Sequence, residues 1–357
     1  MCKNIVAQSV IKNMRRSVLY LPARYRIKLL ERILDSPLVT VRRMLGQASR
    51  PYGLQLSWIH RIKKESWSGT WIIPNLQKNP QPADWAEQMV PEYDLVIMYI
   101  HGGGFRVGSS DMYMASFTHI IERLDKIHGS RAAILSVEYT LAPEAAFPRA
   151  RDECVDAYRY LVHSLGVDPR RIIVAGDSAG GNLTAVTLLH ILQQREHASL
   201  KSLPPLPLPA GAVMISPWIT LETTAPTYAT NSATDYVQIR QLIDHMLDYL
   251  PELRTMDDQQ RHEYICRPEI SPLYANYEGF CPTLVTYGEA EAFQHDNERL
   301  VQRLQQQHVH VDVITRENAA HIWVIEPFAA PSEKIWLEDC SKMVDWCAAT
   351  VKNARGF

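Results

Sequence analysis

The sequence predicts an α/β protein in which a mostly parallel central sheet is flanked by helices and covered at one end by a helical cap. Two observations carry this prediction. Short apolar runs alternate with amphipathic helical patterns through the middle of the chain, and two further helical segments stand outside that alternation. Alternation of this kind is typical of parallel strands joined by crossover helices.

Six strands are expected, at residues 93–100, 132–139, 171–176, 211–216, 283–288 and 310–317. Most of these runs are almost wholly apolar, which is typical of strands in a parallel sheet that is buried on both faces. Helical patterns at 149–165 and 181–196 supply crossovers between them. The proline-rich stretch 200–211 is expected to be a surface loop.

The two segments outside the alternation are expected to pack together as the cap. Residues 1–60 read as N-terminal helices, because "YRIKLLERILD" places apolar side chains on one helical face. Residues 234–268 contain "VQIRQLIDHMLDYL" and read as an insertion between two strands. The sheet domain is then built from residues 61–233 and 269–357.

Composition limits the partners. The chain has 357 residues, 46% of them hydrophobic and 21% charged, with a net charge of −2, so bulk attraction to nucleic acid is not expected. Residues 1–50 hold eleven Lys and Arg but only Glu31 and Asp35 as acids. This basic segment is either a solvated helical face or a peripheral membrane contact, and the sequence leaves both open.

Targeting and redox signals are weak. No apolar run reaches the length of a transmembrane helix, and the N-terminus does not resemble a secretory signal. The six cysteines are scattered without a CxxC pair or a Cys/His cluster, so neither a disulfide framework nor a zinc site is expected. We expect a reducing, cytoplasmic location, with peripheral membrane association left open.

The segment "GDSAG", Gly176 to Gly180, fits the pattern G-x-S-x-G, with a strand before it and a helix after it. Small residues two positions on either side allow Ser178 to occupy a tight turn, and the helix N-terminus directs free N–H groups at a developing oxyanion. The alternative interpretation is a serine that merely begins a helix.

A second motif favours the nucleophile. "HGGG" (101–104) leaves the strand at 93–100, and its glycines let backbone N–H groups turn inward. With Ala179, Gly103 and Gly104 would form an oxyanion hole. The glycine spacing fits neither a Walker phosphate loop nor a dinucleotide-binding fingerprint.

Serine needs a base, and the base needs an orienting acid. His321, in "ENAAHIWV", follows the last predicted strand, which places it where reactive groups gather in such sheets. Three acids follow the strand at 283–288. Glu291 is the first choice, and Glu289 and Asp296 remain open, although Asp296 also reads as a residue of the next helix.

These motifs together resemble the hormone-sensitive-lipase branch of the α/β-hydrolases. The resemblance covers roughly residues 100–325 and rests on "HGGGF" (101–105), "VEYTLAPEAAFPRARDECVDAYRYL" (137–161), "GDSAGGNL" (176–183), "ISPW" (215–218) and "AAHIW" (319–323). "SWSGTWI" and "GEAEAFQHD" are similar to fungal members in particular.

The resemblance implies an α/β-hydrolase fold whose cap is built from N-terminal helices and an insertion. It implies Ser178, His321, Gly103, Gly104 and Ala179 in the roles given above. The family's acid is usually aspartate, whereas Glu291 stands at that position here. Glu144 and Asp152 are expected to support the loop under the site.

The function expected is a serine esterase that hydrolyses small to medium apolar carboxylic esters through an acyl-enzyme, without metal or cofactor, in lipid or secondary metabolism. An amidase, a deformylase, an acyl transferase or a cyclase would use the same site. A non-catalytic ligand receptor is the remaining alternative, and the presence of His321 argues against it.

Four aromatic residues near the motifs are candidate substrate contacts: Phe105, Trp218, Tyr236 and Trp323. Aromatic side chains near a core more often pack than bind a ligand, so both interpretations stay open. The partner expected is a small-molecule ester, and the sequence leaves a homodimer open.

Overall fold

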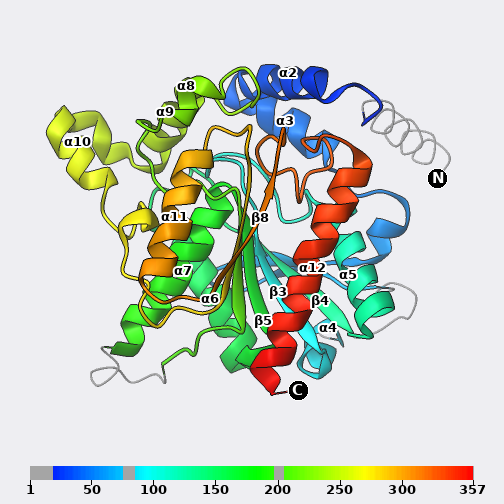
Figure 1. The fold of residues 1–357 in the computed structure, drawn as a ribbon. Coiled ribbons are helices and arrows are strands. Elements are labelled where there is room, and N and C mark those ends of the chain that lie inside the picture. Colours follow the sequence, from blue (N-terminus) through cyan, green and yellow to red (C-terminus); the bar gives the residue numbers. More distant parts are fainter. Residues whose placement is uncertain (1–18, 75–84, 197–204, 357) are drawn as a thin grey trace.

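The structure is a computed structural model that describes residues 19–74, 85–196 and 205–356 (Figure 1). These residues contain an eight-stranded sheet with the strand order β1-β2-β4-β3-β5-β6-β7-β8. The strands are β1 (Ile59–Lys63), β2 (Ser68–Ile72), β3 (Leu95–Ile100), β4 (Ala132–Glu138), β5 (Ile172–Asp177), β6 (Gly211–Ile215), β7 (Thr283–Gly288) and β8 (Val311–Arg316). Strands β3 to β8 are mutually parallel, and β1 and β2 pair antiparallel at one edge.

The six predicted strands are confirmed as β3 to β8, with ends shifted by two residues at most. Strands β1 and β2 were not predicted. Each has five residues, and β1, "IHRIK", carries charged side chains because it is the edge of the sheet. The edge strand β1 and the short strand β2, "SGTWI", which lies between β1 and β4, both lack the continuous apolar run by which the buried strands are recognised.

The sheet separates two apolar layers. Successive residues of β5 alternate between them, with Ile172 and Val174 facing one layer and Ile173 and Ala175 the other. The first layer is covered by α6 (Arg149–Arg159), α7 (Ala179–Glu196) and α11 (Gln294–Gln306). The second is covered by α5 (Met114–His128) and α12 (Glu333–Arg355), which pack against each other. The short helix α4 (Trp85–Met89) precedes β3.

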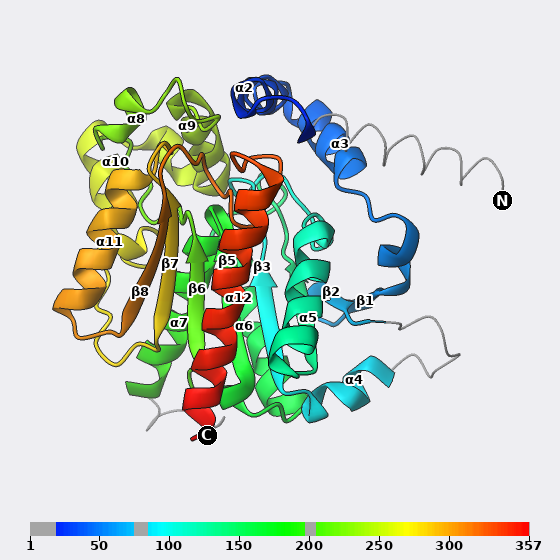
Figure 2. The same cartoon turned by 45° about the vertical axis from the view of Figure 1, so that its right-hand side comes forward.

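The remaining helices gather at the end of the sheet where the parallel strands terminate (Figures 1 and 2). They are α2 (Ala23–Leu34), α3 (Leu38–Ala48), α8 (Thr227–Thr230), α9 (Ile239–Tyr249) and α10 (Asp258–Ile265). Pro251 follows α9, and a short 3₁₀ turn at Pro251–Thr255 separates it from α10, because proline lacks the N–H that a continuing helix needs. The exact domain boundaries stay a prediction.

Two arginines of the basic N-terminal segment make internal contacts. Arg26 on α2 is 2% exposed, and its guanidinium donates to five backbone carbonyls: those of Leu21, Pro327, Phe328, Ala330 and Pro331. Arg42 on α3 donates to the carbonyls of Arg106 and Ala142, each at 2.8 Å. These contacts fix α2 and α3 to loops at the end of the sheet.

The peripheral membrane contact that the sequence left open stays an open alternative, and the part of the basic segment before residue 19 lies outside the described residues. Within the described ranges, no helix combines the length and the apolar character that crossing a bilayer requires.

Candidate active site

Ser178 occupies a strained turn between β5 and α7. Its φ is +52°, in the left-handed region that residues with a side chain rarely adopt. A Cβ at Gly176 would collide with the backbone of Gly180, and a Cβ at Gly180 would collide with the carbonyl of Ile100, so both positions require glycine. The Ser178 N–H donates to the Ile215 carbonyl at 2.9 Å, which fixes the turn to the end of β6.

Asp177, the residue before the serine, attaches the loop after β3 to this turn. We call this loop, residues 101–108, the glycine loop. Its carboxylate accepts the N–H of Gly102 at 2.9 Å, the hydroxyl of Tyr99 at 2.8 Å and the hydroxyl of Tyr113 at 2.6 Å. Burial raises the pKa of Asp177 to about 6, and the three donors act in the opposite direction by stabilising the charged form. The sequence analysis did not single out Asp177, although it is the variable residue of G-x-S-x-G.

The glycine loop, which Gly102 ties to Asp177, carries free backbone N–H groups. Gly103 and Gly104 have φ values of +106° and +60°. Among the described residues, the backbone N–H groups of Gly103, Gly104 and Ala179 donate no hydrogen bond. Ala179 is the first residue of α7, where an N–H has no intrahelical acceptor. Three donors are therefore available to a ligand beside Ser178.

Glu291 is a fully buried carboxylate just after β7. It accepts the Ser216 hydroxyl at 2.7 Å, the Gly288 N–H at 3.1 Å and the Asn297 side-chain amide at 3.1 Å. Its Oε2 lies 3.9 Å from Nδ1 of His321, an ion-pair distance that is longer than a hydrogen bond.

The two alternative acids lie elsewhere. Asp296 is buried on α11, where it pairs with Arg299 one turn later at 3.1 Å. Glu289 is exposed. The structure thus brings Glu291 to His321, and no contact of Asp296 or Glu289 with that imidazole is found in the described residues.

His321 lies on the loop after β8 and is 3% exposed. Its backbone N–H donates to Asp235 Oδ1 at 3.2 Å, and its carbonyl accepts the Tyr236 hydroxyl at 3.2 Å. The ring of Phe293 meets the imidazole edge-on, with centroids 5.0 Å apart. Nδ1 has no hydrogen-bond partner, so the nearby carboxylate of Glu291 is its polar neighbour.

Burial shifts the pKa values of both His321 and Glu291. It lowers the pKa of His321 to about 3, so the imidazole is neutral near pH 7 and able to accept a proton. Burial, with the neighbouring carboxylate of Asp235, raises the pKa of Glu291 to about 8. The three donors to Glu291 act against that rise by favouring the carboxylate.

Asp235 links the loops that carry the acid and the base. Besides the N–H of His321, its carboxylate accepts the N–H of Ala292 at 2.8 Å and that of Tyr236 at 2.8 Å. The residue is 1% exposed, and burial raises its pKa to about 6. It stands at the start of the predicted insertion, and nothing in the sequence pattern marked it.

Ser216 is a third residue, after Asp177 and Asp235, whose role the sequence pattern did not indicate. Its hydroxyl donates to Glu291 and accepts the N–H of Ile322 at 3.0 Å. Its φ of +43° is again left-handed. The one available signal was its place in the "ISPW" segment on which the family resemblance rested.

Three of the four predicted aromatic contacts lie near these groups. Phe105 stacks on Tyr249 of α9 with centroids 3.8 Å apart, and Trp218 lies 5.6 Å from Phe105. Tyr236 contacts the imidazole of His321 edge-on at 5.7 Å. Phe105 and Trp218 thus pack together against α9, whereas Tyr236 belongs to the apolar layer on the other side of the sheet and lies beside His321.

Trp323 has a different environment. It is fully buried in the apolar layer under α12, and its indole N–H donates to Asp339 of that helix at 2.9 Å. This placement makes Trp323 a packing residue of the core.

The loop under the site is supported by Glu144 and Glu153. Glu144 forms a two-pronged pair with Arg42 of α3, which lowers the pKa of the carboxyl to about 2. The expectation for Asp152 is wrong, because its carboxylate pairs with Arg151 at the surface. The next residue, Glu153, instead accepts the N–H and the hydroxyl of Thr140 at 2.5 and 2.8 Å.

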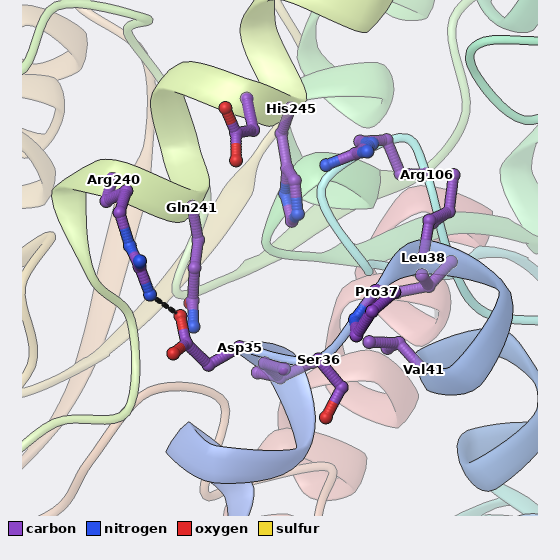
Figure 3. Close-up of a pocket in the computed structure, with 12 residues that line it drawn as sticks. Asp35, Ser36, Pro37, Leu38, Val41, Arg106, Arg240, Gln241 and His245 are labelled. Atoms are coloured by element: carbon purple, nitrogen blue, oxygen red, sulfur yellow. Dashed lines mark hydrogen bonds and ion pairs between the residues drawn. The ribbon is translucent and has the colours of Figure 1, made fainter.

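A pocket of about 330 Å³ lies between the α2–α3 junction and α9 (Figure 3). His245 of α9 and Arg106 of the glycine loop line it, together with Asp35 and Gln241. The His245 ring rests against Gly104, where a Cβ would collide with it. Its Nδ1 has no hydrogen-bond partner, and burial lowers the pKa of the imidazole to about 3. His245 therefore lies between this pocket and Gly104.

Comparison with known proteins shows which family the chain resembles. A family model described as alpha/beta hydrolase fold matches residues 97–325. An esterase of Acinetobacter venetianus is 31% identical over 60% of this chain and 63% of its own length, and an acetyl-hydrolase of Streptomyces hygroscopicus is 32% identical over 58% and 60%. The matched part of the chain thus spans about three fifths of these relatives. The hormone-sensitive lipase of Bos taurus is 42% identical over 27% of this chain and 12% of its own length.

Solved structures match a longer part of the chain than these sequence relatives do. An esterase from the bacterial hormone-sensitive lipase family superposes with a TM-score of 0.71 at 26% identity, covering 92% of this chain and 98% of its own. An esterase from an uncultured bacterium gives 0.70 at 23% identity, covering 91% and 98%. The eight-stranded, mostly parallel sheet accords with these matches. The chain belongs to the alpha/beta hydrolase fold family, in its hormone-sensitive-lipase-like branch.

Proposed function

We propose that this protein is a serine esterase that hydrolyses carboxylic esters of small to medium apolar substrates through an acyl-enzyme. The observation that carries the proposal is the convergence of three loops at one end of the sheet. They present a strained Ser178, free N–H groups at Gly103, Gly104 and Ala179, and His321 backed by Glu291.

Acylation follows from these positions. Nδ1 of His321 faces Glu291, which leaves Nε2 to take the proton of Ser178 as Oγ bonds to the ester carbonyl carbon. The electron pair of the carbonyl moves to its oxygen, and the three N–H groups stabilise the resulting oxyanion. When the bond to the alcohol breaks, Nε2 returns the proton to the leaving oxygen.

Deacylation repeats the sequence with water. His321 takes a proton from water, the hydroxide oxygen bonds to the acyl carbon, and the acid is released as Ser178 recovers its proton. The positive imidazolium that forms in each step needs the negative charge of Glu291. The 3.9 Å gap between Nδ1 and Oε2 is expected to shorten in the substrate complex, as such contacts do when ligands bind.

The buried aromatic rings of Phe105 and Trp218 beside the serine turn, and of Tyr236 beside His321, favour an apolar acyl group. The relatives called esterase and acetyl-hydrolase support the same class of substrate. A competing acyl transferase or amidase would keep this site, so the products decide between them.

Ser178→Ala tests the proposal with p-nitrophenyl acetate as substrate. Loss of the nucleophile is expected to lower kcat on the order of 10⁶-fold, to the level of background hydrolysis. Thermal unfolding of the variant checks that the fold is retained. Unchanged turnover in a folded Ser178→Ala protein would refute the proposal.

A series of esters from acetyl to decanoyl defines the acyl group, with Ser178→Ala as the control. Product analysis with competing alcohols and with matched amides separates hydrolysis from transfer and from amidase activity. A fluorophosphonate probe that fails to label Ser178 in the native protein would instead favour a non-catalytic ligand receptor.

A further inference from the structure

A cluster of metal-binding side chains lies outside the candidate active site. His262 and Cys266 stand one turn apart at the end of α10, and Glu222 reaches them from the segment that follows β6. Within the described residues this is the one group of three or more His, Cys, Asp or Glu side chains whose ligand atoms lie within 4.8 Å of one another. The sequence did not reveal it, because the third residue lies far upstream of the other two.

The spacing of these atoms fits a tetrahedral metal. Zinc bonds of about 2.3 Å to sulfur and about 2.1 Å to nitrogen or oxygen, at tetrahedral angles, place sulfur and nitrogen about 3.6 Å apart and nitrogen and oxygen about 3.4 Å apart. Here Cys266 Sγ is 3.8 Å from His262 Nδ1, and that nitrogen is 3.5 Å from Glu222 Oε1. These two distances are within a few tenths of an ångström of the tetrahedral values, and the ligand atoms of all three residues lie within 4.8 Å of one another.

Surrounding groups hold the cluster in place. The hydroxyl of Tyr274 donates to Oε2 of Glu222, which leaves Oε1 directed at His262. Asp257 and Gln260 form a capping box at the start of α10, which fixes the helix that carries the other two ligands. Such outer contacts are typical of metal sites, where they orient the ligands.

The charges of the cluster also fit a divalent ion. A carboxylate and a thiolate with a neutral imidazole balance the two positive charges of zinc. Arg299 is the nearby cation, because its guanidinium donates to the Tyr274 hydroxyl at 3.3 Å. Arg299 is itself paired with Asp296 at 3.1 Å, which reduces its repulsion of a metal.

We propose that Glu222, His262 and Cys266 bind one zinc ion, with water from solvent as the fourth ligand. The side chain of His262 is 64% exposed, so the ion can enter and keep a water molecule. Binding replaces the thiol proton of Cys266 with zinc and releases that proton to solvent. The ion would fasten α10 to the segment after β6, a structural role outside the esterase chemistry.

Equilibrium dialysis against Zn²⁺ with elemental analysis tests the site. The metal-stripped protein is expected to bind one equivalent, and Cys266→Ser and His262→Gln are each expected to weaken binding at least tenfold. His310→Gln is the matched control, because His310 is an exposed histidine that pairs with Asp312 outside the cluster. Binding that is equally strong in Cys266→Ser and the native protein would overturn the proposal.

Two further readouts keep the test independent of folding and of activity. Without zinc, the variants should unfold at the temperature of the native protein, and zinc should raise that temperature only in the native protein and the His310→Gln control. Ser178→Ala should bind zinc as well as the native chain, so a failed esterase assignment leaves this result intact.

Tyr274→Phe is expected to weaken zinc binding about 10- to 100-fold if its hydroxyl orients Glu222. No zinc binding by the folded native protein would also refute the site.

Discussion

Single side chains decide the chemistry at this site, and Glu291 is the most distinctive of them. A glutamate is one methylene longer than the aspartate usual in the family, and here its carboxylate is fully buried among three donors. The donors favour its charged form, while burial and the carboxylate of Asp235 disfavour it. The pH at which Glu291 becomes charged therefore governs how well it stabilises a protonated His321.

The pH dependence of kcat/KM is expected to reflect that balance. The pKa of His321 is lowered to about 3, so the imidazole stays neutral down to acidic pH and does not limit the rate there. The pKa of Glu291 is raised to about 8, so its charge is gained as pH rises through that value. We predict that kcat/KM for p-nitrophenyl acetate increases toward an alkaline plateau with a midpoint near pH 8.

Glu291→Gln provides the matched variant for this profile. It should lower kcat by about 10³- to 10⁴-fold, as loss of the orienting acid does in such triads, and remove the increase near pH 8. An activity midpoint that is the same in Glu291→Gln and in the native protein would contradict the assignment of that titration to Glu291.

Asp177 is predicted to be a positioning residue for the oxyanion hole. Asp177→Asn replaces one acceptor oxygen by an NH₂ group and removes the charge to which Tyr99, Tyr113 and Gly102 donate. Each hydrogen bond to a charged group contributes about 1.5–3 kcal/mol, so the free energy of unfolding should fall measurably in urea titrations. Because the glycine loop loosens, kcat should fall about 10²-fold with little change in KM. A variant of lower stability but native kcat would assign Asp177 to the fold alone.

At the scale of secondary-structure elements, the helices above the sheet are joined to it by a few specific contacts. Helix α9 contributes Tyr249, which stacks on Phe105, and His245, which rests against Gly104. Helix α3 contributes Arg42, which reaches the loops around Arg106 and Ala142. Periodicity predicted that these helices exist. It could not predict these contacts, because they join residues far apart in sequence.

Helix α9 is predicted to limit the size of the substrate through His245. His245→Ala removes the ring that lies between Gly104 and the pocket of about 330 Å³. The ratio of kcat/KM for decanoyl over acetyl esters should then increase, because the ring no longer blocks a long acyl chain beside Gly104. His310→Ala serves as the surface control. An unchanged ratio would show that acyl groups do not approach the pocket along this path.

Helix α3 is predicted to depend on Arg42 more than on its acidic partner. Arg42→Met leaves the carbonyls of Arg106 and Ala142 without their donor and is expected to lower the free energy of unfolding by about 1.5–3 kcal/mol. Glu144 is half exposed, so Glu144→Gln should cost under about 1 kcal/mol. Urea unfolding of both variants measures the difference. Equal losses would place the stabilisation in the ion pair itself.

For the molecule as a whole, the parallel part of the sheet could be predicted because its strands are apolar on both faces. Ser178, His321 and the glycine loop were visible because strained turns and strand ends demand particular residues. Strands β1 and β2, and the residues Asp177, Ser216 and Asp235, could not be found this way. The role of such a residue depends on partners that only the folded chain brings near. For Asp235 these partners are the N–H groups of His321 and Ala292.

Asp235 limits where the insertion can be exchanged for that of a relative in order to alter substrate specificity. If the junction lies before residue 235, at the predicted boundary between residues 233 and 234, Asp235 is replaced by the residue that the donor protein carries at that position. Without a carboxylate at that point, the buried N–H groups of His321 and Ala292 lose their acceptor, at about 1–3 kcal/mol each. Chimeras should therefore be spliced after Asp235, which shortens the transferable segment relative to the predicted insertion but keeps α9 and α10 whole.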